Sequence, residues 1–185
     1  MYHISNDQRA KKSANKIGSG LLSCLKTKSF TEITVTDVQK SSAVGRATFY
    51  RLFDNITDVL SYLCDNVFEK IGRQYKETGN SNSKQTSLKF IKEWMNNKTL
   101  LKAIIECNRM DLLYNSHAKY IGNNVDFFFP NLSIPHEQLN YLLITMTACV
   151  SACLSAWLKN GACETAEQLQ SRLSDCFKTL SNIFN

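Results

Sequence analysis

Residues 34–60 decide the fold, and they read TVTDVQKSSAVGRATFYRLFDNITDVL. Thr34 stands before a short apolar run, and Asp37 follows three residues later. This spacing is a capping box, in which a hydroxyl and a carboxylate satisfy the backbone N–H groups that begin a helix. The pattern therefore predicts a short helix over residues 35–40, which is interrupted at residues 41–45.

A second short helix is predicted directly after the interruption, over residues 46–53. It has about two turns, and these place Phe49 and Phe53 on one face. We expect both rings to pack in the core of the domain. Two short helices joined by a turn of this length are typical of a helix-turn-helix motif.

Longer amphipathic helices flank the motif on both sides. Upstream, residues 6–27 place apolar side chains at spacings of three and four, as one buried face of a helix requires. These apolar positions are Ala10, Ala14, Ile17, Leu21, Cys24 and Leu25. Downstream, residues 55–75 repeat the spacing. We therefore predict a three-helix domain over residues 1–54 and a second domain over residues 55–185.

The net charge of +6 lies entirely in the first 53 residues, which hold nine basic and three acidic side chains. In residues 54–185 the basic and acidic side chains cancel. Positive charge confined to one domain is typical of nucleic-acid binding, because contacts with phosphates supply most of the non-specific affinity. Charge alone is equally compatible with a solvated basic face.

The helix over residues 46–53 suits the major groove of duplex DNA. It begins with Arg46, Ala47 is small enough for a close approach, and Thr48 can contact a base or a thymine methyl group. Tyr50 and Arg51 can reach phosphates, and the first turn of the preceding helix can offer a hydroxyl and an N–H to another. The predicted DNA-binding residues are Thr34, Thr36, Arg46, Ala47, Thr48, Tyr50 and Arg51.

The rest of the chain is also predicted to be helical, because only 2 prolines in 185 residues leave long stretches without a helix breaker. A last helix is expected after Thr165, which forms a capping box with Gln168. The polar run at residues 78–83 is the clearest loop. The other helices are expected over residues 84–96, 99–107, 109–121 and 135–160.

The last two helices carry more apolar surface than one small domain can bury. Alanines spaced by four residues form a ridge that would let a partner helix approach closely. We predict that these helices pair with their copies in a second subunit as a four-helix interface. The predicted interface residues are Ala148, Ala152, Ala156, Leu169, Leu173 and Phe177. The alternative is that residues 135–160 form the central helix of a monomeric core.

The middle of the chain is rich in aromatic and methionine side chains. In a helical domain such residues can line a pocket for a small apolar or aromatic effector. The predicted pocket residues are Trp94, Met110, Tyr114, His117 and Phe128. The same residue types also form ordinary hydrophobic cores, and an effector can equally be a protein that docks on an exposed aromatic patch.

Signatures of catalysis are lacking in the sequence. Gly18-Ser19-Gly20 lacks the third glycine of a dinucleotide site, and the chain has neither a phosphate loop nor an HExxH motif. Cys149 and Cys153 have a spacing that could hold a metal, but their apolar neighbours favour core packing. The chain is therefore predicted not to be an enzyme, with no catalytic residue, no cofactor and no metal ligand.

The sequence also indicates where the chain works. The 7 cysteines are odd in number and lack paired CxxC spacing, so we expect them to be reduced. The first residues lack the apolar core of a signal peptide. The most apolar run, residues 139–158, is interrupted by asparagine, threonine and serine, and is not expected to span a membrane. A cytoplasmic location is predicted.

Residues 34–60 resemble the DNA-binding segment of the TetR/AcrR family of transcriptional regulators. The likeness is strongest in the run ATFYRLF at residues 47–53, in Thr34 and Val38, and in the continuation DVL at residues 58–60. A weaker likeness covers WLKNG at residues 157–161 and the capped helix that follows, which correspond to the dimerisation end of the family. The resemblance covers both ends of the chain and leaves the middle unmatched.

Three positions depart from the family pattern. Ala43 occupies the turn position where the family usually has glycine, and Gly45 replaces the usual serine cap. Ile56 stands where a lysine commonly contacts phosphate, so one interaction with the DNA backbone is expected to be missing. The pattern of core residues is unaffected by these departures.

The fold class predicted is all-α, with an N-terminal three-helix DNA-binding domain that contains the helix-turn-helix. A larger helical regulatory and dimerisation domain follows, for about nine helices in total. The resemblance implies a homodimer that binds double-stranded DNA at a palindromic operator and acts as a ligand-responsive repressor or activator; we favour a repressor. The alternative is a helical regulator or adaptor controlled by a protein partner rather than a small molecule.

Overall fold

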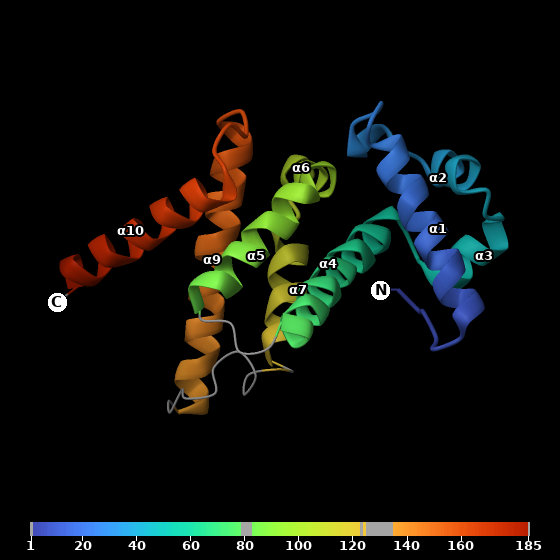
Figure 1. Ribbon diagram of the computed structural model, residues 1–185. Helices are drawn as coiled ribbons and strands as arrows, with labels where there is room; N and C mark the ends of the chain where they lie inside the picture. Colours follow the sequence, from blue (N-terminus) through green and yellow to red (C-terminus); the bar gives the residue numbers. More distant parts are fainter. Residues whose placement is uncertain (1, 79–82, 123, 125–134, 185) are drawn as a thin grey trace. The chain divides into compact units, whose positions relative to one another are not determined.

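The computed structural model describes residues 2–78, 83–122, 124 and 135–184. Within these residues the chain forms nine α-helices and one 3-10 turn, η1 (Phe30–Glu32), which confirms the all-α class (Figure 1). The helices are α1 (Gln8–Cys24), α2 (Val35–Ser42), α3 (Arg46–Leu52), α4 (Ile56–Thr78), α5 (Ser83–Asn96), α6 (Lys98–Glu106), α7 (Met110–Gly122), α9 (His136–Lys159) and α10 (Ala166–Phe184). They differ from the predicted ranges by no more than a terminal turn.

Contacts divide the chain into two compact units. The first unit comprises Met1–Asn66 and Thr99–Leu113, and the second comprises Val67–Lys98 and Tyr114–Asn185. Helix α4 therefore begins in the first unit and ends in the second. The domain boundary predicted between residues 54 and 55 is not tested by this division into contact units, and it stays a prediction.

In the first unit, α1 packs against α2 and α3 (Figure 1). Its inner face is apolar and fully buried at Ala14, Ile17 and Leu21. A Cβ atom on Gly20 would lie 2.8 Å from the Cβ atom of Ser42 and 3.0 Å from its backbone nitrogen. The absence of a side chain at Gly20 therefore lets α1 lie close to the end of α2.

The residues before α1 pack on the end of α3. The backbone N–H of His3 donates to the carbonyl oxygen of Leu52 at 2.8 Å, and Tyr2 forms an isolated antiparallel bridge with Phe53. The Tyr2 ring also lies edge-on to Tyr62, with 5.5 Å between the ring centroids. Residues 2–3, which we call the N-terminal arm, thus contact both the end of α3 and the first half of α4. The sequence pattern did not predict this arrangement.

The second unit has an aromatic cluster in its interior. Between ring centroids, Phe68 of α4 lies 5.7 Å from Trp94 of α5 and 5.2 Å from His117 of α7. Phe90 of α5 lies 5.6 Å from Phe68 and 5.1 Å from His117. All four side chains are buried. The cluster therefore joins three helices through their rings.

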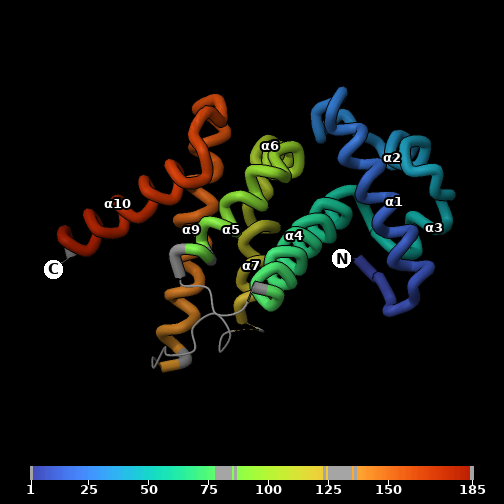
Figure 2. The backbone as a smooth tube through the Cα atoms, viewed as in Figure 1, coloured from blue at the N-terminus to red at the C-terminus, as the bar shows by residue number. Residues whose placement is uncertain are grey.

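Helices α9 and α10 diverge from the short connection that joins them (Figure 2). In this connection Gly161 has a φ of +88°, in the left-handed region that favours glycine. The Trp157 indole donates to the carbonyl oxygen of Glu164 at 3.1 Å. The predicted capping box is present, because the N–H of Thr165 donates to Gln168 Oε1 at 2.8 Å.

The two ends of α10 have different surroundings. Its first half packs on α5 and α9, and Leu169 and Leu173 are buried there. From Ser174 to Ile183 every side chain is exposed. Phe177, Leu180 and Ile183 lie in this exposed half. In a single chain, α10 thus presents an apolar stripe to water.

Among the described residues, Glu137–Lys159 is long and apolar enough to cross a membrane by length and composition alone. Only 28% of its most apolar window is buried within the chain. A helix that packs inside a protein passes the same test, so length and composition alone do not assign Glu137–Lys159 to a membrane. Thr147 and Ser151 are its buried polar side chains.

Candidate DNA-binding site

The site begins at the cap of α2. As the sequence predicts, the backbone N–H of Asp37 donates to Thr34 Oγ1 at 3.2 Å, while the Thr34 N–H donates to Asp37 Oδ2 at 2.9 Å. Lys28 Nζ donates to Asp37 Oδ1 at 2.9 Å. These bonds, that from Lys28 above all, hold the pKa of the Asp37 carboxyl well below its ordinary value. The start of α2 is therefore fixed by a charged cap at neutral pH.

The turn between α2 and α3 contains two of the three departures from the family pattern. Ala43 caps α2 with a φ of 54°, a left-handed conformation that strains an alanine. Gly45 precedes α3 and makes no side-chain cap. The left-handed position of this turn is therefore occupied by alanine rather than glycine.

Helix α3 separates its core face from its solvent face. Phe49 and Leu52 are buried, and Phe53 directly after the helix is also buried, so both predicted core rings are confirmed. On the other face Arg46, Ala47, Tyr50 and Arg51 are exposed, and Thr48 is half-buried. Five of the seven predicted DNA-binding residues thus lie at or near the surface of α3, which has no acidic side chain.

Arg46 and Tyr50 contact each other on this face. The Arg46 guanidinium carbon lies 5.2 Å from the centroid of the Tyr50 ring, and Arg46 Nη2 donates to the Tyr50 hydroxyl at 3.5 Å. The Tyr50 side chain is nevertheless 43% exposed. The pair is one turn apart on α3, which sets a cation over an aromatic ring on the outer surface.

Thr34 and Thr36 differ in what they can still offer to a ligand. The hydroxyl of Thr34 donates to Asp37 Oδ2 at 2.7 Å, and its N–H is bound to the same oxygen. Both of its donors therefore serve the cap. Thr36 is exposed in the first turn of α2, where helix N–H groups point outward. Of the two residues, Thr36 is the better placed to bind a phosphate.

The described members of the predicted effector set lie on two helices, with Trp94 on α5 and Met110, Tyr114 and His117 on α7. Trp94 and His117 belong to the aromatic cluster of the second unit, whereas Met110 belongs to the first unit. Tyr114 is half-buried in the second unit. Phe128 lies outside the described residues. His117 thus joins Trp94 through Phe68 and shares α7 with Met110 and Tyr114, and a pocket formed by these residues stays a prediction.

Hydrogen bonding fixes the tautomer of His117. Thr147 Oγ1 donates its only proton to the carbonyl oxygen of Leu143 at 2.7 Å, so the bond between this hydroxyl and His117 Nδ1 needs a proton on Nδ1. The neutral ring then carries no proton on Nε2. Burial lowers the pKa of His117 to about 4, so the ring is uncharged at neutral pH.

The predicted interface residues fall into two groups. Ala148, Ala152 and Ala156 are exposed along α9, and Phe177 is 38% exposed on α10. The rest of the predicted set, Leu169 and Leu173, is buried within the chain itself. Large apolar side chains also reach the surface near these positions, with Tyr141 74% and Ile144 44% exposed.

Searches with protein-family models and among curated proteins found no match. Solved structures do match the chain over nearly its whole length. Lin0861 of Listeria innocua has a TM-score of 0.78 at 14% identity, with 96% of each chain covered. A TetR transcriptional regulator of Streptococcus agalactiae has a TM-score of 0.60 at 18% identity, covering 90% of this chain and 94% of its own.

Two further structures give the same result. A TetR-family transcriptional regulator of Syntrophomonas wolfei has a TM-score of 0.63 at 19% identity, covering 92% of this chain and 95% of its own. DhaS, an activator of a dihydroxyacetone kinase operon, has a TM-score of 0.62 at 17% identity, covering 92% and 97%. The chain therefore has the helical fold of TetR-family transcriptional regulators.

Proposed function

We propose that the chain is a DNA-binding transcriptional regulator of the TetR family that acts as a homodimer on a palindromic operator. One observation carries the proposal: α3 buries Phe49 and Leu52 while it presents Arg46 and Tyr50 to solvent, within a fold that solved TetR-family regulators share. A short helix that displays a cation and hydroxyl groups next to a turn suits the major groove.

We assign base contacts to Arg46 and Thr48 and phosphate contacts to Tyr50, Arg51 and Thr36. In the free protein the Arg46 guanidinium lies over the Tyr50 ring. Arginine binds guanine through two parallel hydrogen bonds, so Arg46 would leave the ring when it reaches a base. Tyr50 would then turn its hydroxyl toward the backbone.

The decisive experiment compares Arg46→Ala with Arg51→Ala on an operator and on a random duplex, after footprinting with the wild-type protein has located the operator. We expect Arg46→Ala to weaken operator binding by about 1–3 kcal/mol and to relax base choice. Arg51→Ala should weaken both duplexes equally, because phosphates are the same in every sequence. Equal weakening by Arg46→Ala would instead place that residue on the backbone. A wild-type protein that binds no DNA at low salt would refute the function.

We propose that α9 and α10 form the homodimer interface. The exposed alanine ridge of α9 and the exposed half of α10 need a cover, because Tyr141 and Ile183 are 74% and 67% exposed in a single chain. The burial of Leu169 and Leu173 narrows the proposed interface to the alanine ridge and the stripe from Phe177 onward. Light scattering tests the assembly. A monomer that still binds DNA would favour the alternative, in which a protein partner covers this surface.

We propose that a small aromatic effector acts at the aromatic cluster of the second unit, where the sequence predicted Trp94 and His117. Two polar atoms there suit a ligand: the bare Nε2 of His117, and the indole N–H of Trp94, which is buried and unpartnered within the described residues. Trp94 offers a direct readout. In a Trp157→Phe variant, which leaves Trp94 as the single tryptophan, an effector should quench its fluorescence, and this quenching should disappear in His117→Phe.

A further inference from the structure

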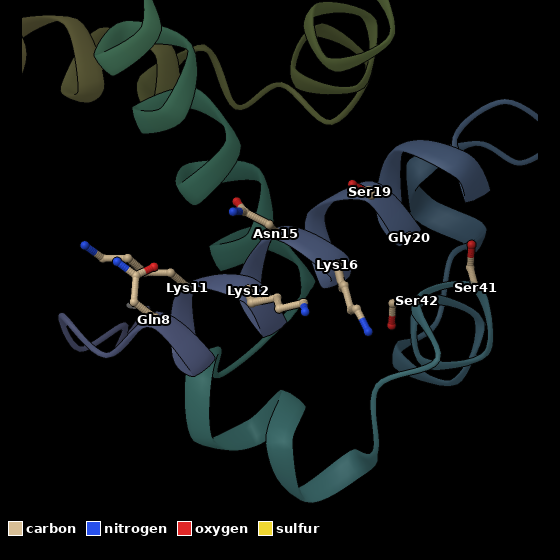
Figure 3. A pocket seen from close by; sticks show the side chains of 9 residues that line it. All are labelled: Gln8, Lys11, Lys12, Asn15, Lys16, Ser19, Gly20, Ser41 and Ser42. Carbon is tan, nitrogen blue, oxygen red and sulfur yellow. The ribbon is translucent and has the colours of Figure 1, made fainter. Parts of the chain in front are cut away.

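An open hollow of about 720 Å³ lies between α1 and the end of α2, apart from the exposed face of α3. Three lysines line it along α1, and the end of α2 contributes two serines (Figure 3). In Figure 3, Lys12 and Lys16 extend from α1 toward the end of α2, where Ser42 lies. Sites for small ligands commonly measure about 300–1,000 Å³. The hollow is therefore large enough for a ligand of nucleotide size.

The lysines of the hollow lack acidic partners. Elsewhere in the described chain Lys28, Lys70 and Lys92 each form an ion pair with a carboxylate. Within the same described residues Lys11, Lys12 and Lys16 form none, and no acidic side chain lines the hollow. Lys12 and Lys16 are also one turn apart, where like charges destabilise a helix. A bound anion would relieve this repulsion.

The other groups of the hollow are mainly hydrogen-bond donors. The hydroxyl of Tyr62 donates to Asn15 Oδ1 at 2.7 Å, which leaves the amide nitrogen of Asn15 with two N–H groups to offer. Ser19 and Ser41 add exposed hydroxyls. The close approach of Gly20 to Ser42 joins the two helices at this point. Ammonium, amide and hydroxyl donors together match phosphate oxygens.

We propose that this hollow, lined by Lys11, Lys12 and Lys16, is a phosphate-binding site separate from the base-reading face of α3. Its phosphates come either from the backbone of duplex DNA outside the half-site or from a small phosphorylated molecule. The DNA source rests on the proposed function, while the second source does not. These lysines contribute to the basic charge of the first 53 residues, but no local pattern groups them into a site, because Ser41 and Ser42 lie more than twenty residues further along the chain.

The test uses Lys12→Gln with Lys16→Gln in the full chain. The control is Lys26→Gln with Lys102→Gln, which removes the same charge from two exposed lysines outside the hollow. Two quantities are measured: the dependence of DNA affinity on salt, and the binding of inorganic pyrophosphate without DNA. Thermal unfolding of each variant verifies that it folds.

If the DNA backbone is the ligand, the slope of log K against log salt becomes shallower by about one for each phosphate that the variant no longer neutralises. Operator and random duplex change equally, and shortening the duplex to the half-site abolishes the difference. If a small molecule is the ligand, pyrophosphate binds the wild type and not the hollow variant, while the slope is unchanged. Hollow and control variants that agree in both measurements overturn the proposal. If the wild type binds pyrophosphate but no DNA, and the hollow variant binds neither, the proposed DNA-binding function is refuted while the phosphate-binding site is supported.

Discussion

The two units differ in how many polar side chains they bury and how many large apolar side chains they expose. In the described part of the first unit, Ser42 and Asp58 are the buried polar residues and Tyr50 is the large apolar residue most exposed. The second unit buries more polar side chains and exposes more large apolar ones. The buried polar set there is Glu93, Ser116, His117, Thr147, Ser151 and Gln170, and the exposed apolar set is Tyr141, Ile144, Phe177, Leu180 and Ile183.

This difference indicates that the two units need different partners. The first unit displays cations, which suits the anionic ligand that we propose for it. The second unit leaves apolar surface uncovered and keeps an uncharged histidine inside, which suits the proposed partner surface and the proposed small effector. We therefore expect charge to dominate binding by the first unit, and burial of apolar surface to dominate binding by the second.

The largest effect is expected from a charge placed on the proposed interface. Ala152→Arg would put two arginines against each other in a symmetric dimer. Burial of an unpaired charge costs about 4 kcal/mol, roughly a thousandfold in the dimer dissociation constant. Sedimentation at micromolar concentration measures the change.

Ser171→Arg is the matched control for this interface. Ser171 is exposed on α10 at a helical angle opposite to Phe177 and Leu180, so the same charge there should leave the mass unchanged. Should Ala152→Arg remain dimeric, α9 would not form the interface, and the exposed apolar surface of the second unit would need another partner.

The buried histidine should make the second unit sensitive to acid. The pKa of His117 is about 4 in the fold and 6.5 as its ordinary value, so the unfolded chain binds more protons between these values. Stability is therefore complete above pH 6.5 and falls by about 3 kcal/mol as the pH drops to 4. Carboxylates with lowered pKa values, such as Glu32 and Glu167, also lose stabilisation as the pH approaches their ordinary value of 4.5, so the effect of His117 is the difference between the wild type and a variant without it.

Urea unfolding at several pH values measures this loss. His117→Gln keeps an N–H donor for Thr147 without a titrating group, so its stability should change less between pH 7 and 4. A His117→Gln profile that coincides with the wild-type profile would show that His117 is charged in the fold.

The packing of the first unit should be sensitive to a single methyl group at Gly20. A Cβ atom there meets the backbone of Ser42 at 3.0 Å, and a helix backbone cannot easily move aside. We expect Gly20→Ala to cost about 2 kcal/mol. At Gly18 the nearest atom is Leu63 Cδ2 at 2.9 Å, the end of a flexible side chain. Gly18→Ala should therefore be neutral or stabilising, and equal losses at both positions would contradict the close approach.

Local patterns predicted the helices well, because caps and apolar spacing act over a few residues. The capping box of Thr34 and Asp37 and the buried rings of Phe49 and Phe53 are examples. Contacts between distant segments were not predictable in this way. The bridge between Tyr2 and Phe53 joins residues more than fifty positions apart, and local spacing carries no information about such a contact.

The exposure of Arg46, Tyr50 and Arg51 also follows from local helical spacing on α3, whereas their contact with DNA stays a prediction. The predicted effector pocket stays a prediction, because composition alone cannot tell which unit an aromatic or methionine side chain joins. Met110 illustrates this, as it falls in the first unit while Trp94 falls in the second. Leu169 and Leu173 illustrate the same limit at the interface, because apolar spacing does not distinguish contact within a chain from contact between chains.

The smallest expected effect is a gain of stability from a substitution in the turn between α2 and α3. Ala43 holds a φ of 54°, and a left-handed conformation costs a residue with a Cβ atom about 1–2 kcal/mol. Glycine removes that cost but adds about 0.4–1 kcal/mol of entropy to the unfolded chain. Ala43→Gly should therefore stabilise the protein by about 0.5 kcal/mol, measured by urea unfolding at one protein concentration.

Two other left-handed positions show whether this gain is local. Ala162 in the second unit has a φ of 56°, so Ala162→Gly should give the same gain, although its surroundings differ. Asn108 has a φ of 53°, but asparagine tolerates this conformation, and Asn108→Gly should give no gain. If only Ala43→Gly stabilised the chain, the strain would belong to the packing of α2 and α3 rather than to the backbone of one residue. A loss of stability at Ala43 would mean that its methyl group makes an interaction worth more than the strain it causes.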